Sequence, residues 1–331
     1  MSDAAPPLLS VRDLRVTFPA RRGRPPMRAV DGVSFDIAPG ETLGLVGESG
    51  SGKTTTGRAI LQLQPADGGS VRLLGQELGT LGARTMRAMR RHMQFVLQNP
   101  YSSLHPRMTV ARILAEPLAM HGTVARRDVP ARIAELMALV GLDPAMATRY
   151  PHEFSGGQRQ RIVIARALAV DPDFVVCDEP VSALDVRTQA QIVELLRGLQ
   201  ERLGLSCLFI AHDLAVVRAV AHRVAVMYAG RIVEIGDAAR VYAGPVHPYT
   251  RNLMDAVPVP DPARQRARLA APFTEPDFRG RAGAAGPCPF GEDHAATGTP
   301  EMHEVAPGHL VSCRFWPPGE APAPIVRRTP G

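Results

Sequence analysis

The sequence predicts an α/β fold in which a sheet surrounds a phosphate-binding loop. Residues 47–54 read Gly-Glu-Ser-Gly-Ser-Gly-Lys-Thr, the pattern G-x-x-x-x-G-K-T. The apolar run Thr42–Val46 before this loop suits a buried strand, and Thr55–Gln64 after it suits a helix. Phe174–Cys177 and Leu205–Ala211 are continuous apolar runs, as expected of parallel strands that are covered on both faces.

The loop at residues 47–54 has the chemistry of a phosphate cradle. Its glycines let several backbone N–H groups point inward at one anion, and the following helix adds the positive end of its dipole. Lys53 would reach the β- and γ-phosphates, and Thr54 would place its hydroxyl on Mg²⁺. The alternative is a glycine-rich turn with a stray lysine, but the flanking strand and helix favour the cradle. The residues expected to bind nucleotide here are Gly47, Glu48, Ser49, Gly50, Ser51, Gly52, Lys53, Thr54 and Thr55.

Composition and charge are those of a globular protein. The 331 residues allow one large domain with an appendage, or two modest domains. A net charge of +6 is compatible with binding to nucleic acid or to an acidic membrane surface. The positive charge is spread along the chain as single arginines, however, and the densest cluster, Arg84–Arg91, suits a solvated helix face. We therefore expect no nucleic-acid partner.

The cysteines and the hydropathy pattern indicate a reducing compartment. Cys177 and Cys207 lie in apolar strand-like runs and are expected in the core, and four cysteines in so long a chain make no disulfide scaffold. Met1–Ser10 has neither the basic start nor the apolar centre of a signal peptide. No apolar run reaches the roughly 18 residues that span a bilayer. Work at a membrane would require docking onto a partner that spans it.

The first elements build a sheet that leads to the phosphate loop. Leu8–Phe18 alternates as a strand, Ala20–Met27 reads as an exposed loop, and Val33–Ile37 is a second strand. Pro39-Gly40 then turns the chain into the strand that feeds the loop. Phe18, at a strand end, suits either a core position or stacking on an adenine ring.

A helical insertion follows two further short strands. Ser70–Leu74 and Met93–Leu97 are the strands, and Gln98–Tyr101 is a polar turn. From Thr109 to Val140 the apolar residues recur at three- and four-residue steps, with a break at Gly122. The insertion therefore separates two parts of a sheet domain.

Phe154–Gln158, of sequence Phe-Ser-Gly-Gly-Gln, is a candidate second anion site. Ser155 is a natural N-cap for a helix over about Arg159–Val170, and the glycines leave N–H groups free at the helix start. Taken alone, the segment would favour a plain capped helix over an anion site.

Polar residues follow the later buried strands. Asp178 and Glu179 end the strand Phe174–Cys177, where open α/β sheets bind ligands. Asp178 suits a Mg²⁺ contact, and Glu179 suits a base that orients and deprotonates water. A solvated acidic loop is the alternative. Ser182–Asp185 precedes a helix over Thr188–Leu203, and His212 follows the next strand, where it could reach a γ-phosphate.

The chain ends in a hairpin and an appendage. Val224–Met227 and Ile232–Ile235 form the expected hairpin, and Tyr249–Ala256 a short helix. Residues 263–331 are rich in Ala, Pro, Gly and Arg with little periodicity, so they predict an irregular extension.

These elements, in this order, resemble the nucleotide-binding domain of ABC transporters over about residues 8–258. The matching motifs are the phosphate loop (Walker A), Gln98 (Q-loop), Phe154–Gln158 (signature), Phe174–Glu179 (Walker B and catalytic glutamate), Ser182–Asp185 (D-loop) and His212 (switch histidine). The resemblance implies a P-loop NTPase fold with a RecA-like core sheet, an antiparallel β subdomain and a helical subdomain. It places the nucleotide-binding domain at residues 1–258, its helical subdomain at about 99–155 and an extension at 259–331.

A narrower resemblance points to the oligopeptide/dipeptide importer ATPases, and to the second of their two ATPase paralogues. Asn99–Val110 carries it, and Pro245–Arg251 with Val257-Pro258 resembles the C-terminal extension of that subfamily. The implied function is to bind and hydrolyse ATP and so to power import of peptides or related solutes. Nickel, opines, sugars and glutathione stay open as cargo.

The resemblance also assigns roles. Lys53 and Thr54 would hold the phosphates and Mg²⁺, and Gln98 and Asp178 would complete the metal's surroundings. Glu179 and His212 would be catalytic with Lys53, the first by polarising water and the second by steadying the γ-phosphate. Two such domains would pair head to tail, so each ATP would also meet residues of the opposite subunit. Those partner-site residues are Ser155, Gly156, Gly157, Gln158 and Asp185.

The implied partners are a paralogous or identical ATPase subunit, two transmembrane permeases and an extracytoplasmic solute-binding protein. The chain would then be peripheral at the cytoplasmic face of the inner membrane. A soluble ABC ATPase of translation or DNA repair and a P-loop kinase or GTPase are the rivals. The first usually fuses two domains or carries a coiled coil, and the second has no use for the segment Ser155–Gln158.

The tail departs from the subfamily. Many members carry four cysteines there, which in some bind an iron–sulfur cluster, whereas only Cys288 and Cys313 match here and Gly291–Pro300 has no cysteine. We expect a tail without metal. The alternative is a metal site that combines cysteines and histidines. The histidines nearby are His294, His303 and His309.

Overall fold

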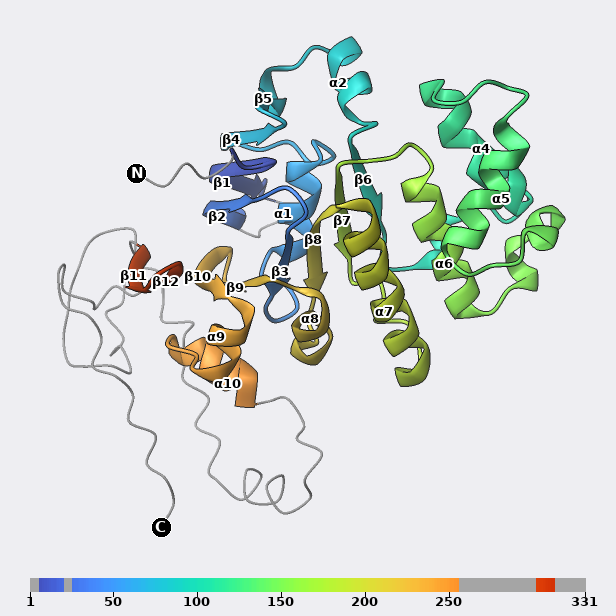
Figure 1. The fold of residues 1–331 in the computed structure, drawn as a ribbon. Helices are drawn as coiled ribbons and strands as arrows, with labels where there is room; N and C mark the ends of the chain where they lie inside the picture. Colours follow the sequence, from blue (N-terminus) through green and yellow to red (C-terminus); the bar gives the residue numbers. More distant parts are fainter. Residues whose placement is uncertain (1–5, 21–25, 256–301, 313–331) are drawn as a thin grey trace, which may run out of the picture.

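The computed structural model describes residues 6–20, 26–255 and 302–312, which form two sheets with helices around them (Figure 1). The smaller sheet is antiparallel, in the order β2-β1-β4-β5. Its strands are β1 (Leu9–Phe18), β2 (Met27–Ile37), β4 (Gly68–Leu73) and β5 (Gln76–Glu77). The predicted β subdomain is thus confirmed, with β2 beginning earlier than the expected Val33.

The larger sheet has the order β11-β12-β10-β9-β3-β8-β7-β6. Neighbours from β9 to β6 pair in parallel, and β10, β12 and β11 add antiparallel strands at one edge. The strands are β3 (Thr42–Val46), β6 (Met93–Val96), β7 (Phe174–Asp178), β8 (Ser206–Ala211), β9 (Arg223–Tyr228), β10 (Arg231–Asp237), β11 (Met302–Ala306) and β12 (His309–Ser312).

The helices cover both faces of this sheet. In β8, Cys207 and Phe209 face one hydrophobic core while Leu208 and Ile210 face the other, which is the alternation that a strand between two layers requires. The helices outside the insertion are α1 (Lys53–Ile60), α2 (Ala83–Met89), α6 (Gly156–Leu168), α7 (Val186–Leu203), α8 (Leu214–Val220), α9 (Ala238–Ala243) and α10 (Pro248–Asp255), with a 3₁₀ turn at Leu78–Thr80.

The predicted helical insertion is confirmed between β6 and α6. Thr109 caps α4 by accepting a hydrogen bond from the Arg112 amide, and Gly122 ends that helix with a left-handed φ of 62°. The expected polar turn after Gln98 is instead helical from Pro100. The elements here are α3 (Pro100–Ser103), α4 (Val110–His121), α5 (Val129–Leu139) and 3₁₀ turns at Pro144–Thr148 and Pro151–Glu153.

The prediction of an irregular extension is wrong for residues 302–312. They form the hairpin β11–β12, which turns at Pro307-Gly308 and pairs through β12 with β10. His309 and Val311, both nearly inaccessible to solvent, anchor it to the sheet. The two strands are too short to give a clear alternating pattern within the surrounding Pro- and Gly-rich sequence. The predicted domain boundary at residue 258 lies outside the described residues.

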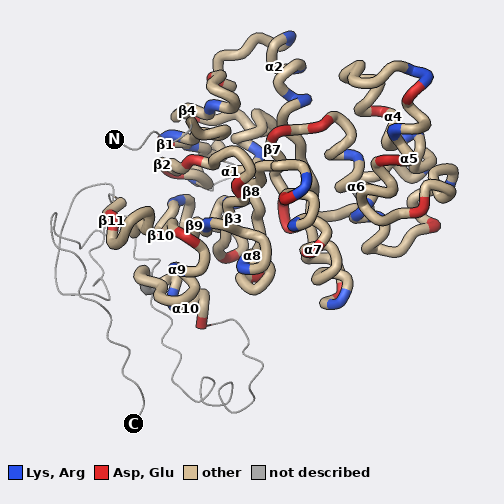
Figure 2. The backbone as a smooth tube through the Cα atoms, viewed as in Figure 1, with Lys and Arg blue, Asp and Glu red and all other residues tan. Residues whose placement is uncertain are grey.

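Charge and hydropathy agree with the expectations from the sequence. Figure 2 shows acidic and basic residues interspersed along the described chain, and the four arginines of Arg84–Arg91, on α2 and the turn after it, are exposed. Cys177 and Cys207 are buried. Among the described helices, none combines the length and the apolar character that crossing a membrane requires.

Candidate nucleotide-binding site

The phosphate loop, residues 47–54, connects β3 to α1 and is packed so closely that only glycine fits at two positions. A Cβ on Gly47 would lie 2.1 Å from the Met227 carbonyl oxygen, and one on Gly52 would lie 2.2 Å from the Ala29 carbonyl oxygen. Both glycines also have positive φ angles. The loop is therefore held between β9 and β2.

The Lys53 ammonium group lies inside this loop. Its Nζ donates to the carbonyl oxygens of Gly47 and Glu48, at 2.8 Å each, and the residue is 5% exposed. Burial lowers the pKa of Lys53, while the negative charges of Glu179, Asp178 and Glu48 oppose that shift. A desolvated ammonium group next to a nest of amides is a site for a polyanion.

One buried polar atom of the loop has no partner. The Ser51 hydroxyl is inaccessible to solvent and forms no hydrogen bond with any described residue. A buried hydroxyl without a partner costs free energy, which a phosphate oxygen would recover. The loop thus fits a phosphate on its geometry as well as on its sequence.

The Thr54 hydroxyl donates to Asp178 Oδ1 at 2.8 Å, which joins the start of α1 to the end of β7. Asp178 is 3% exposed, and burial raises its pKa although the bond from Thr54 and the charge of Arg58 oppose the rise. A hydroxyl and a buried carboxylate are hard oxygen ligands, and a divalent cation would compensate the buried charge. These residues fit Mg²⁺.

Three side chains meet where three neighbouring parallel strands end. Glu179, after β7, accepts from Gln98 Nε2 at 2.8 Å, and the same carboxylate oxygen lies 3.4 Å from Nδ1 of His212. Gln98 follows β6 and His212 follows β8, so the order β8-β7-β6 brings them together, as the sequence predicts. Glu179 has a strained φ of 46°, and its amide donates to the Ile210 carbonyl oxygen.

The signature segment, residues 154–158, is built differently. Buried Phe154 anchors it, and Ser155 and Gln158 form the predicted cap reciprocally: the Ser155 hydroxyl accepts from the Gln158 amide, and Gln158 Oε1 accepts from the Ser155 amide. A Cβ on Gly157 would lie 2.4 Å from Thr188 Cγ2, and Thr188 donates to Asp185. Ser155 and Asp185 are both exposed.

The phosphate loop and the signature segment lie apart. They begin α1 and α6, and Figure 1 shows β8, β7 and β6 between these two helices. One chain therefore does not place both anion-binding segments on the same ligand.

Phe18 is half-buried at the end of β1, where it pairs with Met27 of β2. Its stacking on adenine stays a prediction. Cys288, Cys313 and His294 lie outside the described residues. His309 has its Nε2 atom 2.8 Å from Glu234 Oε1, and the described residues hold no cluster of three or more His, Cys, Asp or Glu suited to a metal ion.

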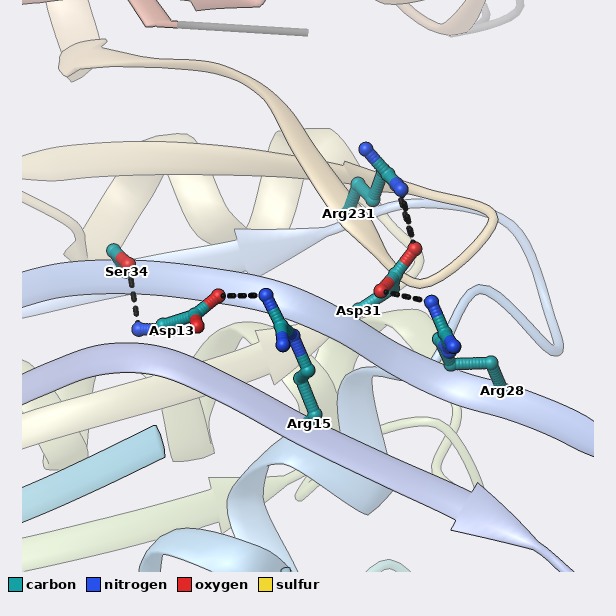
Figure 3. Close-up of polar contacts among 6 residues, drawn as sticks. All are labelled: Asp13, Arg15, Arg28, Asp31, Ser34 and Arg231. Carbon is teal, nitrogen blue, oxygen red and sulfur yellow. Dashed lines mark hydrogen bonds and ion pairs between the residues drawn. The ribbon is translucent and has the colours of Figure 1, made fainter. Parts of the chain in front are cut away.

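The phosphate loop is also supported by β2 and the β9–β10 turn, which no local sequence pattern predicts. Gly230 of this turn donates to the Ser51 carbonyl oxygen and accepts from the Asp31 amide. Figure 3 shows the Asp31 carboxylate between Arg231 and Arg28, at 2.9 Å from Arg231 Nε and 3.0 Å from Arg28. Burial alone would raise the pKa of Asp31, but the bonds from Arg231 and Arg28 lower it.

The same view shows how the two longest strands of the small sheet are joined. The Asp13 amide donates to Ser34 of β2, and the Asp13 carboxylate accepts from Arg15 of β1 (Figure 3). Asp13 has a φ of 48°, at a register shift between β1 and β2. Such contacts carry no local sequence signal.

Comparisons with known proteins agree with the geometry. Residues 30–182 match the family model described as ABC transporter, and residues 233–293 match that of the oligopeptide/dipeptide transporter C-terminal region. The chain is 49% identical to a putative peptide import ATP-binding protein of Brucella ovis, over 93% of this chain and 97% of that one. It is 54% identical to the glutathione import ATP-binding protein GsiA of Shigella flexneri, over 78% of this chain and 42% of that one.

Solved structures are similar as well. The ATP-binding cassette MJ0796, in a dimeric post-hydrolysis state bound to ADP and Pi, superposes with a TM-score of 0.63 at 28% identity. That match covers 70% of this chain and 98% of the other. The protein cbiO1 of Clostridium perfringens shares the fold, with a TM-score of 0.64 at 23% identity and coverage of 72% of this chain and 91% of that one.

Proposed function

Because the chain belongs to the ABC transporter family of ATP-binding import subunits, we propose that it powers import of peptides and that its ATP site consists of the residues described above. Like its relatives, it is an ATP hydrolase coupled to transport. The observation that carries the site assignment is the meeting of Gln98, Glu179 and His212 at one edge of the sheet. They follow the consecutive strands β6, β7 and β8, and β8 lies next to β3, which leads into the phosphate loop.

Nucleotide binding is assigned to the phosphate loop and to two residues outside it, Gln98 and Asp178. The loop amides and the Lys53 ammonium group hold the phosphates, and the Ser51 hydroxyl finds its partner there. Thr54 and Asp178, which share a hydrogen bond, would hold Mg²⁺ together with Gln98. When bound, Mg²⁺ neutralises charge on the phosphates.

The hydrolytic step is assigned to Glu179. Its carboxylate accepts a proton from the attacking water, and Gln98 and His212, which both contact that carboxylate, orient it and the γ-phosphate. The main work of these residues is positioning and charge stabilisation, because phosphoryl transfer requires little covalent chemistry from the protein.

A second ATPase subunit completes the site. Within one chain the signature segment lies apart from the phosphate loop. Its Ser155, which caps α6, is exposed and could meet a phosphate on another molecule. The dimeric state of MJ0796 supports such pairing. We propose a paralogue as the partner because residues 99–110 and 245–251 resemble one of the two ATPase paralogues of the oligopeptide/dipeptide importers.

A groove of about 300 Å³ beside the site is the proposed docking surface for a membrane permease. It lies between the insertion and the sheet, and Leu63 and Met120 on its rim are 49% and 56% exposed. Leu97, which also lines it, precedes Gln98, so a shift in the groove reaches the Glu179 contact directly. A chain docked there would be peripheral at the cytoplasmic face of the membrane, and a solute-binding protein would lie on the other side.

Peptides are favoured over glutathione as cargo. The relative named for peptide import matches nearly end to end, including the C-terminal region, whereas the match to the one named for glutathione import covers 42% of that protein. Both cargoes share a peptide backbone with charged ends.

Uptake by cells tests this function. In cells lacking this chain, uptake of a labelled dipeptide is expected to fall to background, and the wild-type chain but not Glu179→Gln should restore it. Unchanged dipeptide uptake in the deletion strain would refute the cargo assignment. Full restoration by Glu179→Gln would refute the assignment of the hydrolytic residue.

A further inference from the structure

The segment that follows β10 contacts the phosphate loop. Tyr249, in the first turn of α10, is 2% exposed, and its phenol oxygen accepts a hydrogen bond from the Glu48 amide at 2.9 Å. Its ring packs on that of Tyr228, with centroids 4.5 Å apart. Tyr228 ends β9 immediately before the turn in which Gly230 holds the Ser51 carbonyl oxygen. These two neighbouring contacts thus fix the loop at Glu48 and at Ser51.

A buried carboxylate fixes the position of Tyr249. Glu234 of β10 is fully buried and accepts from the amides of Val246 and His247, at 2.9 Å each. Those residues lead into α10. A buried charge is stable only when it is hydrogen-bonded, so Glu234 holds this segment firmly.

The third partner of Glu234 comes from the C-terminal hairpin. His309 of β12 is 4% exposed, and its Nε2 atom lies 2.8 Å from Glu234 Oε1. Since a carboxylate only accepts, this nitrogen carries the proton. A continuous set of contacts therefore runs from the hairpin through Glu234 and the residues before α10 to Tyr249 and the phosphate loop.

We propose that Tyr249 is a positioning residue of the phosphate loop and that the hairpin β11–β12 holds it in place through Glu234. The loop is then ordered before nucleotide arrives, which lowers the entropy cost of binding. The C-terminal extension in this way sets the affinity for ATP and leaves the hydrolytic step unchanged. The choice of ATP as ligand rests on the proposed function.

The first test measures binding of Mg²⁺–ATP to the full chain, by displacement of a fluorescent ATP analogue. Tyr249→Phe removes the acceptor of the Glu48 amide and should weaken binding about three- to tenfold. The matched control is Tyr242→Phe on α9, a half-buried residue whose hydroxyl donates to the Leu214 carbonyl oxygen and not to the loop. It should leave affinity unchanged. Equal affinity of Tyr249→Phe and wild type would overturn the proposal.

The second test joins the hairpin to the loop. His309→Ala should weaken ATP binding by a factor similar to Tyr249→Phe, and His309→Gln, whose amide can donate to Glu234, should restore it. If the hairpin acts on the loop only through Tyr249, the double variant Tyr249→Phe/His309→Ala should bind Mg²⁺–ATP no more weakly than whichever single variant has the lower affinity. Fully multiplicative losses would show that the hairpin acts independently and would overturn the link.

Lys53→Ala separates this inference from the function on which it rests. If Lys53→Ala binds Mg²⁺–ATP as well as wild type, the site assignment itself is wrong. If Lys53→Ala loses binding while Tyr249→Phe does not change it, only the role of Tyr249 is wrong. At saturating ATP, phosphate release by the Tyr249→Phe chain in its assembled pair should match wild type, since only positioning for binding has changed.

Discussion

The phosphate loop and the signature segment are both candidate anion sites at a helix start, yet the surrounding structure supports them differently. The loop is enclosed by β2, β9 and Tyr249, and Lys53 within it is 5% exposed. The signature segment satisfies its own cap through Ser155 and Gln158 and remains exposed. The phosphate loop is ordered by its own chain, and we propose that the signature segment is presented to a second subunit.

The largest expected effect is that of a substitution at Glu179, which should reduce ATP hydrolysis without reducing ATP binding. Glu179→Gln should lower phosphate release by about a thousandfold, because the base that accepts the proton of water is lost. Affinity for Mg²⁺–ATP should stay within about threefold of wild type, since Gln can still contact Gln98. Phosphate release and equilibrium binding on the same preparation check this. Wild-type turnover would remove Glu179 from the mechanism.

Two substitutions distinguish the role of the phosphate loop from that of the signature segment. Lys53→Ala should weaken ATP binding to the single subunit about a hundredfold, because it removes a buried charge-assisted contact to the phosphates. Ser155→Ala should leave that affinity unchanged and lower turnover only in the assembled pair. Titration of each chain with a fluorescent ATP analogue gives the result. A loss of single-subunit affinity in Ser155→Ala would mean that both segments serve one ligand within one chain.

Gly157→Ala tests how the signature segment is seated on α7. The added Cβ would meet Thr188 Cγ2 at 2.4 Å, and the Thr188 hydroxyl is already bound to Asp185. The free energy of unfolding should fall by about 1–3 kcal/mol. Gly156→Ala, with 3.3 Å to Leu184 Cδ2, is the milder control. Adding Thr188→Ser, which keeps the hydroxyl, should recover most of the loss in urea unfolding.

The smallest effect concerns acid stability of the segment that leads to Tyr249. Burial lowers the pKa of His247 from 6.5 to about 4, with Glu234 opposing and Arg251 adding to the shift. Its Nδ1 accepts from the Tyr249 amide, so the folded chain holds it neutral. Between these pKa values the unfolded chain binds more protons, so stability should fall as pH drops from 6.5 towards 4.

The size of that loss should be of the order of 2 kcal/mol, and His247→Asn, whose Oδ1 can accept the same bond, should lack it. Urea midpoints across this pH range provide the measurement. Identical pH profiles for wild type and His247→Asn would contradict the assignment.

The sequence predicts the site well where its parts are local or end at one sheet edge. The glycine pattern of residues 47–54 and the apolar runs before Asp178 and His212 suffice, because parallel strands bring their carboxyl ends together. The contacts that hold the phosphate loop in place could not be predicted from the sequence. Tyr249 and Glu48 are 201 residues apart, and the hairpin that holds Glu234 consists of two very short strands. Such contacts depend on tertiary pairing, which leaves no periodicity in the sequence.

The central claim is that hydrolysis requires the phosphate loop of one subunit and the signature segment of another. Phosphate release per subunit, measured for the ATPase pair over a wide range of subunit concentrations at saturating Mg²⁺–ATP, tests it most directly. Specific activity should rise with concentration and reach a plateau as pairs form. Constant specific activity down to concentrations at which sedimentation shows single subunits would contradict it.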